Sequence, residues 1–150
     1  MDVVVIETPQ LGDRSYLVHD GHVGLVIDAQ RDTDRIEEAA RQAGVDITHV
    51  AETHVHNVYL TGGLILARAH GAKYLVNAAD SVAFEREPIT DGQSVQIGGF
   101  SLRAVATPRP HPHPPHIMPN RQLPPPVCST ALRTFYTGST AIAGPTQRTT

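Results

Sequence analysis

The chain changes character at Pro108, and this break limits its possible folds more than any other feature. Nine of its twelve prolines lie between Pro108 and Pro126. Proline has no backbone N–H to donate and clashes with the preceding helical turn, so a segment this rich in proline forms neither a helix nor a central strand. We therefore predict an ordered domain over residues 1–107, an irregular segment rich in proline and histidine over 108–127, and a separate tail over 128–150.

The first 107 residues have the pattern of an α/β domain. A helix is predicted to begin at Asp32 or Thr33 and to end at Gly44, because apolar residues recur between them at helical spacing. A second helix is predicted over residues 59–69. Apolar and β-branched runs predict strands at residues 3–8, 15–18, 23–27, 47–53, 73–77, 94–97 and 100–106. This order predicts a mixed sheet covered by helices on at least one face.

The net charge and the length of the longest apolar stretches bear on which partners and which cell compartment we expect. The net charge of −3 gives no reason to expect nucleic acid or an acidic membrane as a partner. Apolar stretches such as residues 64–67 are far shorter than the ~20 residues that cross a bilayer. The first residues show no basic stretch followed by a cleavage site, and Cys128, the single cysteine, cannot form an internal disulfide. We therefore expect a cytoplasmic protein.

Two histidines follow the strand predicted at residues 47–53. His54 and His56 stand two residues apart, and in a turn their side chains can converge on one ion. Neutral imidazole is a good ligand for zinc and for iron. The spacing alone also fits two unrelated surface histidines, so the interpretation depends on the residues around the pair.

Those surrounding residues resemble a known signature. The segment 52–63 is similar to the His-x-His-x-Asp-His motif of the metallo-β-lactamase fold superfamily. The likeness is greater to the branch that contains persulfide dioxygenases, glyoxalase II-type thioesterases and rhodanese-linked hydrolases. It extends over most of residues 1–108, because the strand order, the aspartate after the third strand and the final hairpin also fit. The matching motif residues are Glu52, Thr53, His54, His56, Asn57, Tyr59, Gly62 and Gly63.

The resemblance implies a fold and a chemistry. The fold would be the first half of an αββα sandwich, with helices on one face of a mixed sheet. The chemistry would be metal-dependent hydrolysis of a small molecule, such as a thioester or thiol conjugate, by a metal-bound water. Zinc, or alternatively iron as in the related dioxygenases, would be held by His54, His56 and His111. His113 and His116 are further candidates for the third ligand, and the resemblance gives no residue a clear role as general base.

Two departures from the family pattern bear on activity. The family aspartate falls on Val58, which can neither bind a metal ion nor accept a proton. The family turn Thr-Pro-Gly-His is replaced by Thr107-Pro108-Arg109-Pro110-His111, which places the histidine one residue late. Codons for Pro-Arg-Pro-His can encode Pro-Gly-His-Thr in the adjacent frame, so a frameshift after Pro108 is one hypothesis for the proline-rich stretch.

The remaining sequence leaves a second interpretation open. Residues 135–139 and 147–149 loosely resemble later family segments, so the tail over 128–150 is either weakly family-like or disordered. The position of a bridging family aspartate falls near Ser139, which is not a replacement ligand. The alternative to an active hydrolase is therefore a truncated, inactive family member, or a protein that binds metal or a partner without catalysis.

Several other residues are predicted to have structural roles. Asp28 and Glu52 are the acids nearest the histidine motif, and both are predicted to support the fold. Gly62 and Gly63 lack the spacing of a phosphate-binding loop, so we predict close packing of the second helix. Four histidines match no ligand spacing and are predicted to serve in turns, packing or the surface: His19, His22, His49 and His70.

The resemblance also raises the question of what covers the sheet. In the family sandwich, the second sheet comes mostly from later sequence than this chain provides. We therefore expect one apolar face of the first sheet to be exposed, and the protein to self-associate through it.

Overall fold

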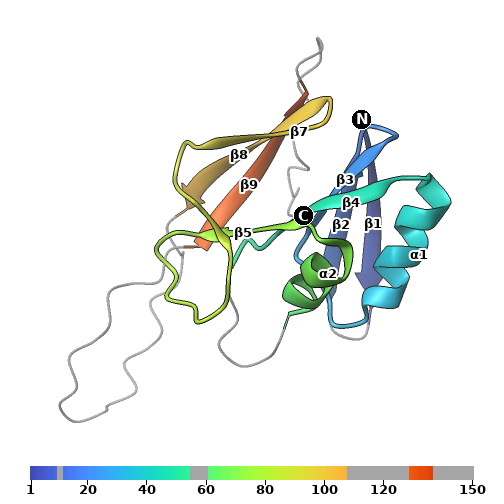
Figure 1. Ribbon diagram of the computed structural model, residues 1–150, viewed down its shortest axis with the longest axis horizontal. Helices are drawn as coiled ribbons and strands as arrows, with labels where there is room; N and C mark the ends of the chain where they lie inside the picture. The colour runs from blue at the N-terminus through green and yellow to red at the C-terminus, as the bar shows by residue number, and fades with distance from the viewer. Residues whose placement is uncertain (10–11, 55–60, 108–128, 137–150) are drawn as a thin grey trace, which may run out of the picture.

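The computed structural model describes residues 1–9, 12–54, 61–107 and 129–136, and within them the chain forms two β-sheets and two α-helices (Figure 1). The large sheet has six strands in the order β1-β2-β3-β4-β5-β6. Strands β1 to β3 are antiparallel neighbours, and β3 to β6 are parallel. The strands are β1 (Asp2–Thr8), β2 (Asp13–His19), β3 (Val23–Ile27), β4 (Asp46–Ala51), β5 (Lys73–Asn77) and β6 (Glu87–Ile89).

The helices lie in the connections between parallel strands. Helix α1 (Thr33–Ala43) connects β3 to β4 and buries Ile36 and Ala40. It ends at Gly44, whose φ of 67° is a left-handed conformation that glycine adopts without strain. Helix α2 (Gly63–His70) precedes β5, so the second helix begins later than the predicted Tyr59; residues 59 and 60 lie outside the described residues. No helix of the described residues is long and apolar enough to cross a membrane.

The small sheet packs against the face of the large sheet opposite the helices (Figure 1). It consists of the antiparallel strands β7 (Ser94–Ile97), β8 (Phe100–Thr107) and β9 (Ser129–Tyr136). Ile97, Phe100 and Leu102 are fully buried and share one core cluster with Leu25 and Leu75 of the large sheet. The layers are therefore helix, sheet and sheet, as the predicted half-sandwich requires.

This packing corrects the predicted exposure of the sheet face. The β7–β8 hairpin lies over the centre of the large sheet, so most of that apolar face is covered. Among the described residues of this face, the exposed valines lie at the β1 end, with Val3 49% and Val5 48% exposed. The sequence did not show how the hairpin would fold back. Because the face is covered, exposed apolar surface no longer supports self-association through it. Self-association itself stays an untested prediction.

The carboxylate of Asp20 joins the two sheets. Asp20, in the β2–β3 turn, accepts backbone N–H donors from His22 and Val23, and its other oxygen accepts the N–H of Gly99 at 2.7 Å. The hydrogen bond from Val23, followed by those from Gly99 and His22, lowers the pKa of Asp20 to about 2. Asp20 therefore stays charged at neutral pH and ties the β7–β8 turn to the large sheet.

The last described strand lies in the tail. Ser129–Tyr136 forms β9 and pairs with β8 from Phe100↔Tyr136 to Thr107↔Ser129. Of the two interpretations of residues 128–150, disorder is therefore wrong for residues 129–136. Residues 128 and 137–150, and the proline-rich residues 108–127, lie outside the described residues.

Candidate functional site

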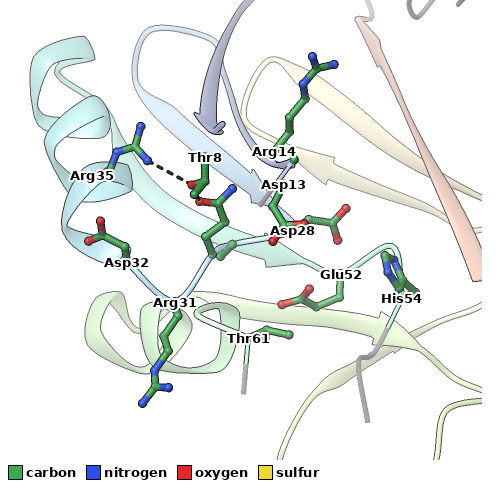
Figure 2. A pocket seen from close by; sticks show the side chains of 13 residues that line it. Thr8, Asp13, Arg14, Asp28, Arg31, Asp32, Arg35, Glu52, His54 and Thr61 are labelled. Carbon is green, nitrogen blue, oxygen red and sulfur yellow. Dashed lines mark hydrogen bonds between the residues drawn. The ribbon is translucent and has the colours of Figure 1, made fainter. Parts of the chain in front are cut away.

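A pocket of about 800 Å³ opens at the carboxyl ends of β3 and β4 (Figure 2). Because these strands are parallel neighbours, the residues that follow them reach the same edge of the large sheet. Asp28 follows β3, whereas Glu52 and His54 follow β4. Asp13, at the start of β2, and Thr61, just before α2, line the same pocket. This edge of the sheet therefore gathers carboxyl, hydroxyl and imidazole groups.

Asp28 is held in an uncommon backbone conformation at the base of this pocket. Its φ of 52° lies in the left-handed region, which few residues other than glycine, asparagine and aspartate adopt. Its N–H donates to the carbonyl of Ala51 at 2.9 Å, and its own carbonyl accepts the Ser15 hydroxyl at 2.7 Å. These contacts with β4 and β2 fix the direction of the Asp28 side chain.

The Asp28 carboxylate in turn positions the residue before His54. One oxygen accepts the backbone N–H of Thr53 at 2.7 Å, and the other accepts the Thr53 hydroxyl, also at 2.7 Å. This competition for the Thr53 N–H explains why β4 ends at Ala51 rather than at the predicted Thr53. The chain therefore leaves the sheet just before the histidine motif.

The Thr53 hydroxyl also decides the tautomer of His54. Its oxygen lies 2.9 Å from Nδ1 of His54. Because the hydroxyl proton is donated to Asp28, the oxygen is left to accept a proton from Nδ1. A neutral imidazole protonated on Nδ1 has its lone pair on Nε2, the arrangement in which a histidine coordinates a metal ion through Nε2. The relay Asp28–Thr53–His54 therefore fixes the His54 ring with its lone pair on Nε2.

Glu52 lies behind this relay in a buried position, with 3% of its surface exposed. Its carboxyl oxygen accepts the Tyr74 hydroxyl at 3.0 Å, and that hydroxyl lies 3.3 Å from the hydroxyl of Thr61. Burial raises the pKa of Glu52 to about 7; the charge of Asp28 acts in the same direction, while the Thr61 and Tyr74 hydrogen bonds oppose it. Glu52 thus links β4 to β5 and to the start of α2, in agreement with its predicted structural role.

Both glycines of the motif pack without room for a side chain. A Cβ on Gly62 would overlap the carbonyl oxygen of Gln30, and a Cβ on Gly63 would overlap a carboxyl oxygen of Glu52 and lie 2.9 Å from the Tyr74 ring. The predicted close packing of the second helix is confirmed. The two glycines set the distance between α2 and the floor of the pocket.

The structure places one of the three predicted metal ligands. His54 lines the pocket, and Figure 2 shows it beside Glu52 where the chain leaves β4. His56 and His111 lie outside the described residues, as do His113 and His116. Among the residues that are described, no three of histidine, cysteine, aspartate and glutamate lie close enough to share a metal ion. The predicted ligand set therefore stays a prediction.

The other described histidines lie away from the pocket. His19 and His49 are buried, and burial followed by the nearby Lys73 ammonium lowers the pKa of His49. His70 is exposed on α2, 3.3 Å from a Glu37 carboxyl oxygen. Sequence reasoning missed the role of Thr53; the available signal was a hydroxyl residue directly before the first histidine.

Replacing Asp28 with alanine is expected to loosen the His54 relay. The variant loses two hydrogen bonds to a charged group and strains a backbone with positive φ, so the free energy of unfolding should fall by about 3 kcal/mol. Asp28→Asn keeps one acceptor and tolerates the same φ, so it should lose about half as much. Urea unfolding of the three proteins measures both values. Equal stability of the alanine and asparagine variants would contradict the relay.

Replacing Glu52 with glutamine is expected to change how stability depends on pH. The pKa of Glu52 is raised from its ordinary value of 4.5 to about 7 in the folded protein. Between these two pH values the unfolded chain has already lost the proton, so the free energy of unfolding falls as pH rises. The glutamine variant should lack this decline and exceed the wild type by about 1–3 kcal/mol at pH 8. Urea unfolding at pH 5 and pH 8 measures the difference, and parallel pH profiles for both proteins would refute the assignment.

Comparisons with known proteins agree on one fold. No family model matches the sequence. Hydroxyacylglutathione hydrolase of Acidiphilium cryptum strain JF-5 is 32% identical over 107 residues, which cover 69% of this chain and 44% of that protein. The chain thus spans less than half the length of this relative.

Two solved structures have the same arrangement of sheets and helices. ETHE1 from Myxococcus xanthus superposes with a TM-score of 0.64 at 21% identity, covering 72% of this chain and 49% of that one. A metallo-β-lactamase from Staphylococcus aureus subsp. aureus COL superposes with a TM-score of 0.65 at 23% identity, covering 71% of this chain and 34% of that one. At these identities the superpositions establish the fold.

Proposed function

This chain belongs to the metallo-β-lactamase fold superfamily, and from that premise we propose that it is a metal-dependent hydrolase of small thiol or thioester conjugates. The observation that carries the proposal is the relay from Asp28 through Thr53 to His54, which places the lone pair of His54 on Nε2, one of the two nitrogens through which histidine coordinates a metal ion. A relay of this kind fixes both the orientation and the basicity of a metal ligand.

The proposed ligands of the metal ion are His54, His56 and His111. The described part of the chain fits this role at His54, through the tautomer set by Thr53. A bound zinc ion would supply an activated water for hydrolysis, and iron in the same place would supply redox chemistry with O₂. The chain's own task is to hold His54 through Asp28 and to close the floor of the pocket through Glu52 and Tyr74.

The size of the pocket supports a small substrate. Its volume of about 800 Å³ lies within the usual range of ~300–1,000 Å³ for small-molecule sites. The Acidiphilium relative is named for the hydrolysis of an acylated thiol, hydroxyacylglutathione. A thiol or thioester conjugate is therefore the substrate class that we propose, in a cytoplasmic setting.

Metal content per chain tests the proposal. Purified protein should hold about one zinc or iron ion per chain, and His54→Ala/His56→Ala should lose it, since two of three protein ligands are removed. His22→Ala, which changes an exposed histidine in the β2–β3 turn, is the matched control and should keep the metal. Inductively coupled plasma mass spectrometry measures all three. Metal that is absent, or equally present in the double variant, would refute the proposal.

A second candidate function is metal binding without turnover. Val58 occupies the position of the family aspartate, and no acidic residue follows Asp91. A chain of this kind would bind metal through His54 and release no thiol from thioesters. Hydrolysis of an S-acyl glutathione, followed by detection of the free thiol, separates the two candidates once metal content is known.

A further inference from the structure

The two edges of the large sheet differ in how they are protected. β6 forms one edge and has three residues, of which Pro88 lacks an N–H and Glu87 is paired with Lys73 at 3.4 Å. β1 forms the other edge and has seven residues, with no proline and no lysine. Its pairing with β2 runs without a bulge from Asp2↔His19 to Thr8↔Asp13. Short strands, prolines, bulges and charged side chains, above all lysine, are the usual means by which proteins keep an edge from pairing. Of these, β1 has only Asp2 and Glu7, which flank the uncharged run from Val3 to Ile6.

The side chains of β1 add an apolar strip to this edge, which pairs with no further strand among the described residues. Val4 and Ile6 pack toward the helices, whereas Val3 and Val5 point to the opposite face and are about half exposed, at 49% and 48%. Figure 1 shows β1 on the side of the large sheet away from β8 and β9. The strip therefore lies beyond the cover of the small sheet.

We propose that β1 pairs in antiparallel fashion with β1 of a second copy of this chain, about a two-fold axis through Val4. In this register Val3 lies opposite Val5 of the second copy, Val4 opposite Val4, and Asp2 opposite Ile6. Directly opposite residues of an antiparallel pair share a face, so both valine strips join on one side and both helix-facing rows on the other.

The registers shifted toward Glu7 are less favourable. A shift by one residue would place Asp2 opposite Glu7, two like charges, and would bring valines of one copy onto the helix side of the other. A shift by two residues toward Glu7 would need its outward carbonyl, which Arg35 already binds at 2.9 Å. The register centred on Val4 uses only Asp2 to Ile6, which these contacts leave available.

The predicted dimer is small and weak. Five paired residues cover about 17 Å of strand. A contact this short buries much less surface than the ~1,200–2,000 Å² of a standard stable interface. We therefore expect a dissociation constant in the micromolar range. Because a two-fold interface uses the same edge of both copies, assembly stops at the dimer.

Sedimentation velocity across ~1–500 µM protein tests the interface, a range that brackets micromolar dissociation. The wild type should shift from monomer to dimer, and Val5→Lys should stay monomeric at every concentration, since a lysine on the strip opposes strand pairing. Ile65→Lys is the matched control, because Ile65 is 53% exposed on α2 and should leave the dimer unchanged. A wild type that stays monomeric, open-ended assembly, or equal dimerisation of Val5→Lys would overturn the proposal.

Cross-linking tests the register independently of Val5. In a Cys128→Ser background, Val4→Cys places a thiol on the two-fold axis, within disulfide distance of its symmetry mate. Asp2→Cys is the control, because its symmetry mate lies four residues, about 14 Å, along the strand. Treatment with diamide should yield a covalent dimer of the Val4 variant and not of the Asp2 variant. The reverse pattern, or no cross-link in either variant, would overturn the proposed register.

Discussion

Gly62→Ala is expected to lower the free energy of unfolding by about 3 kcal/mol, the upper end of the usual cost of overpacking. The added Cβ would overlap the carbonyl oxygen of Gln30, and it would lie 2.8 Å from the Gln30 carbonyl carbon and 3.0 Å from Cγ2 of Thr33. The backbone angles of Gly62, φ −68° and ψ −15°, suit any residue, so steric overlap alone sets the cost. The obstacle is backbone, which cannot rotate away as a side chain can.

The same substitution should also disturb the pocket. The Gly62 N–H donates to the Ala29 carbonyl at 3.0 Å, so a shift of Gly62 moves the start of α2 relative to the loop after β3. Gly99→Ala is the matched control, because a Cβ there meets only Asp20 side-chain atoms at 3.4 Å and beyond. Urea unfolding measures both variants. A Gly62→Ala protein within 1 kcal/mol of the Gly99→Ala protein would contradict this close approach.

Phe100→Ala is expected to cost about 3–5 kcal/mol, the range for removing a buried aromatic ring from a core. Phe100 is fully buried in the cluster that joins the two sheets. Phe100 is the first residue of β8, directly after the β7–β8 turn. The same turn is also held to the large sheet by the hydrogen bond from the Gly99 N–H to the Asp20 carboxylate. The cavity would therefore weaken the contact that covers the apolar face.

The measurement for Phe100 pairs stability with exposure of that face. Thermal unfolding should show a lower midpoint, and binding of the dye ANS should rise as the small sheet loosens. Ile65→Ala removes a side chain that is already 53% exposed, so it should change neither quantity appreciably. A Phe100→Ala protein that unfolds like Ile65→Ala would mean that the two sheets do not share a core.

Local pattern was enough for most of the secondary structure. The strands predicted at 23–27, 73–77 and 94–97 are β3, β5 and β7 with the same bounds, and the helix between Thr33 and Gly44 is α1. In each case alternation, helical spacing or a terminal glycine lies within the element itself. β6 was not predicted, because three residues that include Pro88 hold too little pattern to show a strand.

The candidate site could be located from the sequence but not assembled from it. The histidine motif and the family resemblance marked His54, and the superfamily and fold that they implied are confirmed. The contact between Asp28 and Thr53 joins residues 25 positions apart, and only the parallel pairing of β3 and β4 brings them together. The role of Thr53 as the link to His54 was invisible without that pairing.

The sequence by itself determined where the chain turns, where most of the strands lie and which motif it inherited, because those properties depend on residues close together in the chain. The tertiary structure decided where α2 begins, where β4 ends and which part of the sheet stays exposed. Gly62 contacts Gln30 across 32 positions, and Thr53 contacts Asp28 across 25. Ile97 of the β7–β8 hairpin shares a core cluster with Leu25, 72 positions earlier. Contacts over such separations are set by packing in three dimensions, which no local pattern records.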